Sequence, residues 1–181
     1  MQFERKWKNS SKLGGQNTLE YSVWHSMIQR STKYQGNYTQ VSYDDRFKDF
    51  DYFHEWCQEQ VGFREVDNKG KIFSLDKDIL SEGFGVYSPE TCVFIPPVLN
   101  NLFKNPYRDL PRGVYEREVK KSSSKRYVST IGKDRRCIHL GSFHSSEEAK
   151  EAYDAARKEY LQELYEMYSV RVDGRVWEKI L

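Results

Sequence analysis

The residues with the clearest capacity for chemistry are two carboxylates that flank a lysine, in the segment Asp76-Lys77-Asp78. A carboxylate pair at this spacing can bind Mg²⁺, which prefers oxygen ligands. The same tripeptide is typical of an ordinary charged loop, so the residues leave both interpretations open. A lysine acts as a general base only where its surroundings lower its pKa by several units from about 10.4, and flanking carboxylates oppose that change.

A second candidate is a basic stretch between residues 112 and 137, where nine lysines and arginines stand against three acidic residues. The following segment, residues 145–166, reverses this balance, with seven acidic residues against three basic ones. The whole chain has a net charge of only +2. A general polyanion binder is therefore excluded, and any basic surface has to be local.

Three short strands and a helix are expected to position the basic residues. Alternating side chains predict strands over residues 113–118, 125–132 and 136–143, joined by hairpins, of which the polar stretch 120–125 is one loop. Ser145 is a favourable N-cap, and Glu147 and Glu148 suit the first turn of a helix. Alanines and tyrosines follow at helical spacing, so this part of the chain reads as a βββα unit.

Strand alternation would give the expected sheet two different faces. Tyr127 and Ile131 share one face of the second strand, and Arg126 and Thr130 share the other. If the apolar set packs on the helix, the basic and polar set faces outward, where it fits the major groove of B-DNA. A solvated sheet face with ordinary surface charges is the alternative, and charge and alternation do not decide between the two.

The N-terminal part combines helices with short extended segments. Apolar spacing predicts helices over residues 19–30 and 47–57, the second capped by Asp44 or Asp45. Their aromatic stripes indicate a buried core, and a protein-docking surface is the alternative. His25 and His54 lie on these helices, where a structural role is the more common one.

Cysteine usage and hydropathy limit the class of protein. Cys57, Cys92 and Cys137 are widely spaced, which argues against a disulfide framework or a cysteine-rich zinc site and fits a reducing compartment. No apolar run is long enough for a membrane span, and the N-terminus lacks the apolar region of a signal peptide. We therefore expect an intracellular protein with no membrane partner.

A proline-rich seam over residues 100–113 predicts a domain boundary near Arg108. It divides the chain into residues 1–107, with mixed helices and strands, and residues 108–181, with the βββα unit and a helical extension. The predicted fold class is α+β.

The C-terminal part resembles the AP2 DNA-binding domain between residues 112 and 160. The similarity lies in Arg112-Gly113-Val114-Tyr115, in Leu140-Gly141-x-Phe143, and in Ala149-x-x-Ala152-Tyr153-x-x-Ala156. It implies a three-stranded sheet that enters the major groove of double-stranded DNA. The positions that contact DNA in that family correspond here to Arg112, Tyr115, Arg117, Thr130, Cys137 and His139. Further phosphate contacts are expected from Lys125, Arg126, Lys133, Arg135 and Arg136. Tyr115, Cys137 and His139 depart from the family's Arg or Trp, so the resemblance does not give the target sequence.

The N-terminal part resembles phage HNH homing endonucleases that carry an AP2 domain, through "YSVWHSMIQR", "FKDFDYFHEWC", "LDKDIL" and "YSPETCVFIPPVLNNLF". An HNH finger is a ββα unit in which an Asp and an Asn hold one divalent metal and a His activates water. The resemblance implies Asp76, Lys77 and Asp78 as catalytic residues, and Asp76, Asp78 and Thr91 as Mg²⁺ ligands. Lys77 stands where the His would be and Thr91 where the Asn would be, and both depart from the pattern.

Together these observations predict a sequence-specific double-stranded DNA-binding protein that acts in the cytoplasm of an infected bacterial host. Two versions stay open. One is a metal-dependent DNA endonuclease of the HNH type, and the other is a non-catalytic regulator or inhibitor that keeps a degenerate HNH finger as a scaffold.

Overall fold

The computed structural model of the chain describes residues 7–32, 41–81, 85–103, 109–118, 125–133 and 136–181. These residues form a mixed α+β protein, which confirms the predicted class at that level. The chain divides into two compact units, which we call unit 1 (Met1–Leu102 with Tyr168–Ile180) and unit 2 (Phe103–Met167 with Leu181). The predicted boundary at Arg108 lies outside the described residues.

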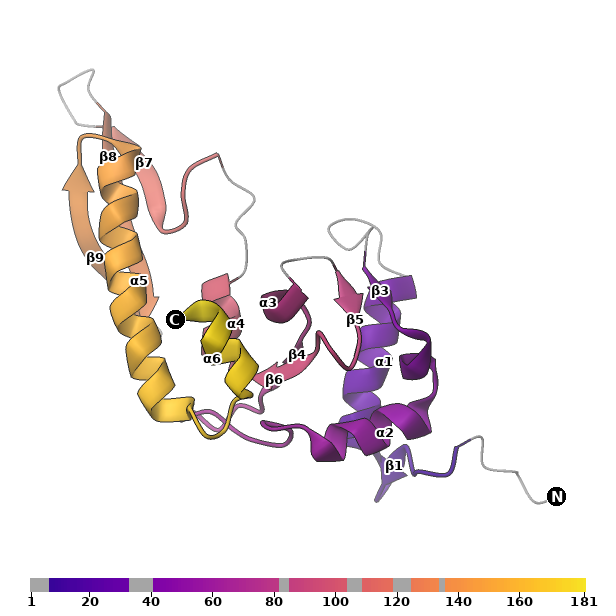
Figure 1. Cartoon of the computed structure of the whole chain (residues 1–181). Coiled ribbons are helices and arrows are strands. Elements are labelled where there is room, and N and C mark those ends of the chain that lie inside the picture. Colours follow the sequence, from indigo (N-terminus) through magenta and orange to yellow (C-terminus); the bar gives the residue numbers. More distant parts are fainter. Residues whose placement is uncertain (1–6, 33–40, 82–84, 104–108, 119–124, 134–135) are drawn as a thin grey trace. The chain divides into compact units, whose positions relative to one another are not determined.

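In its described residues, unit 1 combines short helices with small two-stranded sheets (Figure 1). Its helical elements are α1 (Leu19–Thr32), η1 (Asp45–Lys48), α2 (Phe50–Glu59), α3 (Asp78–Ser81), α4 (Pro97–Phe103, whose last residue falls in unit 2) and α6 (Gly174–Ile180). Its strands are β1 (Lys12–Leu13), β2 (Gln16–Asn17), β3 (Ser42–Tyr43), β4 (Ser74–Asp76), β5 (Val86–Tyr87) and β6 (Val93–Ile95). β1 pairs with β2 and β4 with β6, both antiparallel, whereas β3 and β5 are parallel.

The expected helix over residues 47–57 is divided at Asp49. Asp44 caps η1 by accepting a hydrogen bond from the backbone N–H of Arg46, and Asp49 caps α2 by accepting from that of Asp51. Each aspartate satisfies a backbone donor that a helix start leaves open, so two short helices replace one long one. The predicted cap at Asp44 is confirmed for the first of them.

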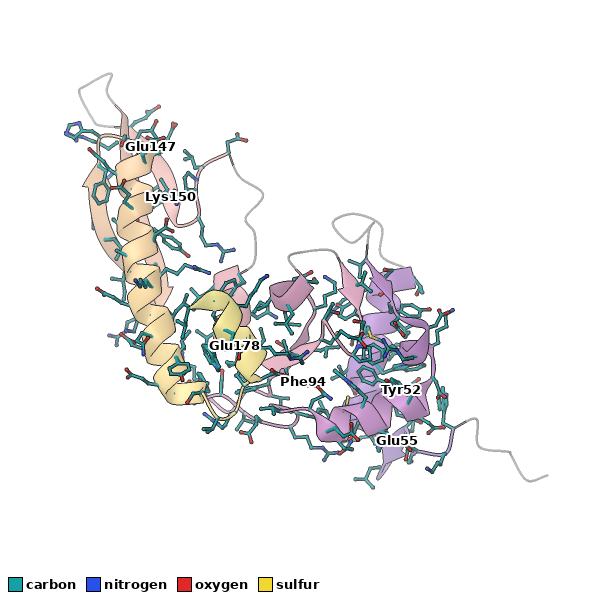
Figure 2. The ribbon with its side chains drawn as sticks, in the orientation of Figure 1. Tyr52, Glu55, Phe94, Glu147, Lys150 and Glu178 are labelled. Carbon is teal, nitrogen blue, oxygen red and sulfur yellow. The ribbon has the colours of Figure 1, made fainter. Side chains whose placement is uncertain are left out.

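Aromatic rings from these two helices form the core of unit 1, as their spacing predicted. Phe47 lies 5.0 Å from Phe53 and 4.9 Å from Trp56 between ring centroids, both edge-to-face. Trp56 also contacts Phe94 of β6. Figure 2 labels Phe94 on β6, and Tyr52 and Glu55 on α2. These rings are buried, so the aromatic stripe of η1 and α2 forms core, whereas Trp24 of α1 is half-buried.

Unit 2 contains the three strands and the helix expected from the sequence. The strands are β7 (Val114–Glu118), β8 (Lys125–Lys133) and β9 (Arg136–Phe143), and they form an antiparallel sheet in the order β7-β8-β9. Helix α5 (Ser146–Tyr168) lies along this sheet (Figure 1), and its last residue belongs to unit 1. Its buried residues include Ala149, Tyr153, Tyr160 and Leu164, in line with the predicted helical spacing, together with Leu161 and Tyr168.

Helix α6 falls in unit 1. Val176 and Trp177 are the buried residues of α6, and the preceding loop is tied to unit 1 by the Arg171 guanidinium, which donates to the Val66 carbonyl at 3.0 Å. The chain therefore returns to its first unit after α5, a long-range pairing that sequence spacing does not reveal.

The N-terminus of α5 is capped as predicted. Ser145 Oγ accepts a hydrogen bond from the backbone N–H of Glu148 at 3.1 Å, and the Glu148 carboxylate accepts one from the N–H of His144. Ser145→Ala is expected to lower the free energy of unfolding by about 1 kcal/mol because it leaves the Glu148 N–H without its acceptor. Denaturant titration measures this loss, and Ser146→Ala is the matched control, since the Ser146 hydroxyl contacts only the Glu147 carboxylate in the described contacts. Equal stability of the two variants would contradict the cap.

Among the described residues, no helix is both long enough and apolar enough to cross a lipid bilayer.

Candidate functional site

The strand register of unit 2 defines two faces of its sheet. Residues directly opposite each other on neighbouring strands share a face, and Tyr115, Val128 and Ser142 are aligned in this way. A β-bulge at Leu140 shifts the alternation in β9, so that His139 and Ser142 lie on one face although they are three residues apart. We call this the outer face, and its residues are Tyr115, Arg117, Arg126, Val128, Thr130, Gly132, Cys137, His139 and Ser142.

The opposite, inner face packs on helix α5. Val114, Ser129 and Ile131 of this face are buried, and Lys133 reaches the helix at its far end. The separation of faces inferred from alternation is therefore present in the structure, with Tyr127 and Ile131 on the helix side and Arg126 and Thr130 on the outer side.

Two arginines face each other on the outer side. Arg117 of β7 and Arg126 of β8 are direct cross-strand partners. The acidic residues of β7, Glu116 and Glu118, alternate onto the inner side, so among the described residues the outer face carries no carboxylate. Like charges in directly opposite positions destabilise a sheet, which makes this pair a feature that folding alone does not explain.

Apart from the two arginines, the outer face carries apolar and hydrogen-bonding side chains, with one imidazole at His139. Tyr115 is 44% exposed and Cys137 and His139 are also exposed, whereas Val128 between them is 1% exposed. His139 Nε2 lies 3.4 Å from the Ser142 hydroxyl, a contact that the bulge makes possible. Thr130 donates its hydroxyl to the Gly113 carbonyl at 3.4 Å. This part of the face thus offers hydrogen-bonding groups and an aromatic ring with little charge.

Two of the basic residues predicted to contact DNA lie against helix α5 instead of on the outer face. Lys133 Nζ donates to Glu163 Oε1 at 2.7 Å and lies 5.1 Å from the centre of the Tyr160 ring. Arg112 hydrogen-bonds Tyr153, where burial raises the pKa of the Tyr153 hydroxyl and the Arg112 guanidinium opposes that rise. Both side chains fasten the sheet to its helix.

The remaining basic candidates have different placements. Arg136 is exposed and, by its pairing with Lys133, belongs to the inner face at the end of β9. Arg135 and the side chain of Lys125 lie outside the described part of the chain. Of the predicted basic contacts, Arg117 and Arg126 are therefore the two that the described structure brings together.

The acidic residues of unit 2 gather on α5. Figure 2 shows Glu147 and Lys150 on the first turns of the helix. Lys150 forms an ion pair with Asp154 along the helix surface, and the exposed Glu151 and Glu159 lie on the same helix. Because α5 covers the inner face, its carboxylates are kept off the outer face. The charge reversal near residue 145 thus corresponds to the change from sheet to helix.

In unit 1, Asp76 acts as a cap for helix α3. Its Oδ1 accepts hydrogen bonds from the backbone N–H groups of Asp78 at 3.0 Å and Ile79 at 2.9 Å. The side chain is buried, at 8% exposure for the residue, and this burial raises the pKa of its carboxyl group against the lowering effect of the backbone hydrogen bonds. Asp76 therefore has a structural function at the start of α3.

Lys77 is buried between its neighbours. Its Nζ donates to Asp78 Oδ1 at 2.5 Å and lies 5.4 Å from the centre of the Tyr87 ring. Asp78 is the exposed partner, with 54% of its side chain accessible. The ammonium group neutralises the one carboxylate of this turn that is open to solvent.

Thr91 is engaged in a closed turn. Its hydroxyl donates to the Val86 carbonyl at 2.7 Å, accepts from the Ser88 N–H at 3.1 Å and lies 3.1 Å from the Ser88 hydroxyl. Next to it, burial raises the pKa of the Cys92 thiol to about 12, so that thiol stays protonated. Neither residue offers a free ligand.

These residues do not fit a Mg²⁺ site. An ammonium group lies on Asp78, the Asp76 carboxylate holds two backbone donors, and the Thr91 hydroxyl is already saturated. Within the described ranges, no group of three or more His, Cys, Asp or Glu side chains is arranged to hold a metal ion. The antiparallel pair β4 and β6 is followed by α4, with α3 and β5 inserted between the two strands, and the side chains at the expected positions serve the local fold.

A polar cluster around Glu20 was missed from the sequence. Glu20 is 1% exposed, and its carboxylate accepts from Arg64 Nη2 at 2.5 Å and Gln58 Nε2 at 2.9 Å. Burial alone would raise the pKa of this carboxyl, but hydrogen bonds from the backbone, Arg64 and Gln58 outweigh it and keep the pKa below its ordinary value. His54 Nε2 lies 3.9 Å from Glu20, so this histidine belongs to the edge of a structural cluster. An acidic residue in a first helical turn is too common to signal such an anchor.

No protein-family model, curated protein or solved structure matches the chain.

Proposed function

We propose that this protein binds double-stranded DNA through the outer face of the β7-β8-β9 sheet, and that unit 1 serves as a non-catalytic scaffold. The observation that carries the proposal is the separation of charge across the sheet. Arg117 and Arg126 stand opposite each other on a face free of described carboxylates, while the acids lie on α5 and on the inner side of β7. An exposed cationic sheet of this width can enter the major groove and reach phosphates and base edges.

The resemblance to AP2 domains supports the same face, because five of the six positions expected from it belong to the outer face, namely Tyr115, Arg117, Thr130, Cys137 and His139, whereas Arg112 lies against α5. Under this proposal the protein acts where DNA is accessible, in the cytoplasm of the infected bacterial host that the resemblance implies. Its biological role is then that of a regulator or inhibitor that occupies a DNA site.

The scaffold role of unit 1 rests on the contacts of Asp76, Lys77 and Thr91. A metal-dependent nuclease needs ligands with free oxygen atoms and a base with an accessible lone pair. Each of these side chains instead has a partner within the turn or helix that it belongs to. The competing function, HNH-type cleavage, would require the contacts of Lys77 and Thr91 to be broken, whereas Asp76 could offer Oδ2 while Oδ1 keeps its two hydrogen bonds.

A binding and cleavage experiment tests the proposal. The purified full chain is incubated with duplex DNA from its own genomic surroundings, in Mg²⁺, in Mn²⁺ and in EDTA. We expect salt-sensitive binding that is the same under all three conditions, with the DNA intact. Failure to bind duplex DNA at low salt would overturn the proposal, and metal-dependent nicking that Asp76→Asn removes would overturn its non-catalytic part.

A further inference from the structure

We propose that Arg117 and Arg126 act as one clamp for a single backbone phosphate, and that sequence is read by the uncharged remainder of the outer face. This inference rests on the proposed function, and it assigns different tasks to two ends of one surface. The resemblance to AP2 domains places Arg117 among DNA contacts without saying what it holds. The register and charges of the sheet supply that assignment.

Arg117 and Arg126 occupy directly opposite positions on the neighbouring strands β7 and β8. Their Cβ atoms are therefore about 5 Å apart. Guanidinium groups carried on directly opposite residues repel each other unless an anion lies between them. A phosphate carries a full negative charge and accepts hydrogen bonds from two guanidinium groups at once, whereas a base edge offers only partial charges.

The two outer arginines differ from Lys133, another cation of β8, in their protein partners. Lys133 has a protein counter-ion, Glu163, supplied by α5. Among the described residues no carboxylate contacts Arg117 or Arg126, and the acids nearest in sequence, Glu116 and Glu118, alternate to the inner face. The chain thus neutralises the cation that faces its helix and leaves the outer pair for an external anion.

Side-chain charge decreases along the outer face, from the two arginines at one end to uncharged groups at the other. Beyond Val128, the outer residues are Thr130, Gly132, Cys137, His139 and Ser142, with Tyr115 beside Val128. Hydroxyl, imidazole and aromatic groups contact base edges and thymine methyl groups but contribute little to phosphate neutralisation. A duplex that lies across the sheet would meet phosphate-binding groups at the Arg117 end and base-reading groups at the other.

The test is the salt dependence of binding, measured with the full chain on duplexes of random sequence and on a selected site. Each neutralised phosphate contributes about 0.9 to the slope of log K against log salt concentration. Arg117→Ala and Arg126→Ala are each expected to weaken binding to all sequences about equally but to reduce the slope by less than about 0.9, because the remaining guanidinium still contacts the shared phosphate. The double variant should lose about 0.9 in total, because the one shared phosphate is then no longer neutralised, whereas two independent contacts would cost about 1.8.

Two comparisons complete the design. Tyr115→Ala is expected to keep the slope while changing the preference among sequences, and Lys150→Ala, on the surface of α5, is the control that changes neither. The like-charge pair also predicts that Arg117→Ala keeps the melting temperature or raises it by up to about 4 °C, so lost binding is not lost folding. If the wild-type chain binds no DNA, the proposed function fails. If it binds but Arg117→Ala alters only sequence preference, or the two arginines reduce the slope independently, the clamp is wrong.

Discussion

Gly113→Ala is expected to lower the free energy of unfolding of unit 2 by about 3 kcal/mol and to weaken DNA binding with it. Gly113 has φ = 73°, a conformation that costs an alanine about 1–2 kcal/mol. An added Cβ would lie 2.6 Å from the Thr130 carbonyl oxygen and 2.2 Å from Tyr153 Cδ2. The backbone oxygen cannot rotate away, so the start of β7 has to shift.

The position of Gly113 explains why such a shift affects function. Its carbonyl accepts a hydrogen bond from the Thr130 N–H at 2.8 Å, which aligns β7 with β8. A shift at the start of β7 would move Tyr115 and Arg117 away from their cross-strand partners on the outer face of β8. Denaturant unfolding and DNA titration measure the two effects. Gly132→Ala is the matched control for stability alone, because its Cβ would meet nothing within 4 Å, and a Gly113→Ala protein as stable as that control would contradict this packing.

Asp76→Ala is expected to destabilise unit 1 by about 2 kcal/mol, because it leaves the N–H groups of Asp78 and Ile79 without an acceptor at a buried helix start. Asp76→Asn keeps an oxygen at the same place and is expected to remain within about 1 kcal/mol of the wild type. The two variants therefore separate the cap, which needs only an oxygen, from a metal ligand, which needs the negative charge.

The pH dependence of the Asn variant provides a second readout. Burial raises the pKa of Asp76 in the folded chain, so the folded state binds this proton more tightly than the unfolded state does. The stability from this group is present below the unfolded pKa of about 3.9 and is lost as the pH rises through the folded pKa. Asparagine does not titrate, so Asp76→Asn should remove this decline with rising pH. Urea denaturation across the acidic range measures it, and an unchanged decline would show that Asp76 is not its source.

The sheet of unit 2 could be predicted from the sequence because its signals are local. Strand alternation, a Ser145 cap and alanine spacing specify β7, β8, β9 and α5 almost to the residue. The sequence did not reveal the bulge at Leu140, which depends on cross-strand register. It also did not reveal that Lys133 and Arg112 contact α5, because alternation gives the face of a residue but not the reach of a long side chain.

Unit 1 was predictable only in part. Aromatic spacing located its core, but the break at Asp49 depends on competition between two caps, and the return of α6 depends on contacts far along the chain. The Asp76-Lys77-Asp78 segment illustrates a broader limit. A carboxylate that caps a helix and one that binds a metal have the same residue type, and only the hydrogen bonds of Oδ1 distinguish them.

The most direct test of the DNA-binding face is a titration of the isotope-labelled full chain with duplex DNA, followed by amide chemical-shift changes in NMR spectra. Binding through the outer face predicts the largest changes at Tyr115, Arg117, Thr130 and His139, with small changes at Glu151 and Glu159 on α5. Large changes confined to α5 or to unit 1, with the outer-face strands unaffected, would contradict the account.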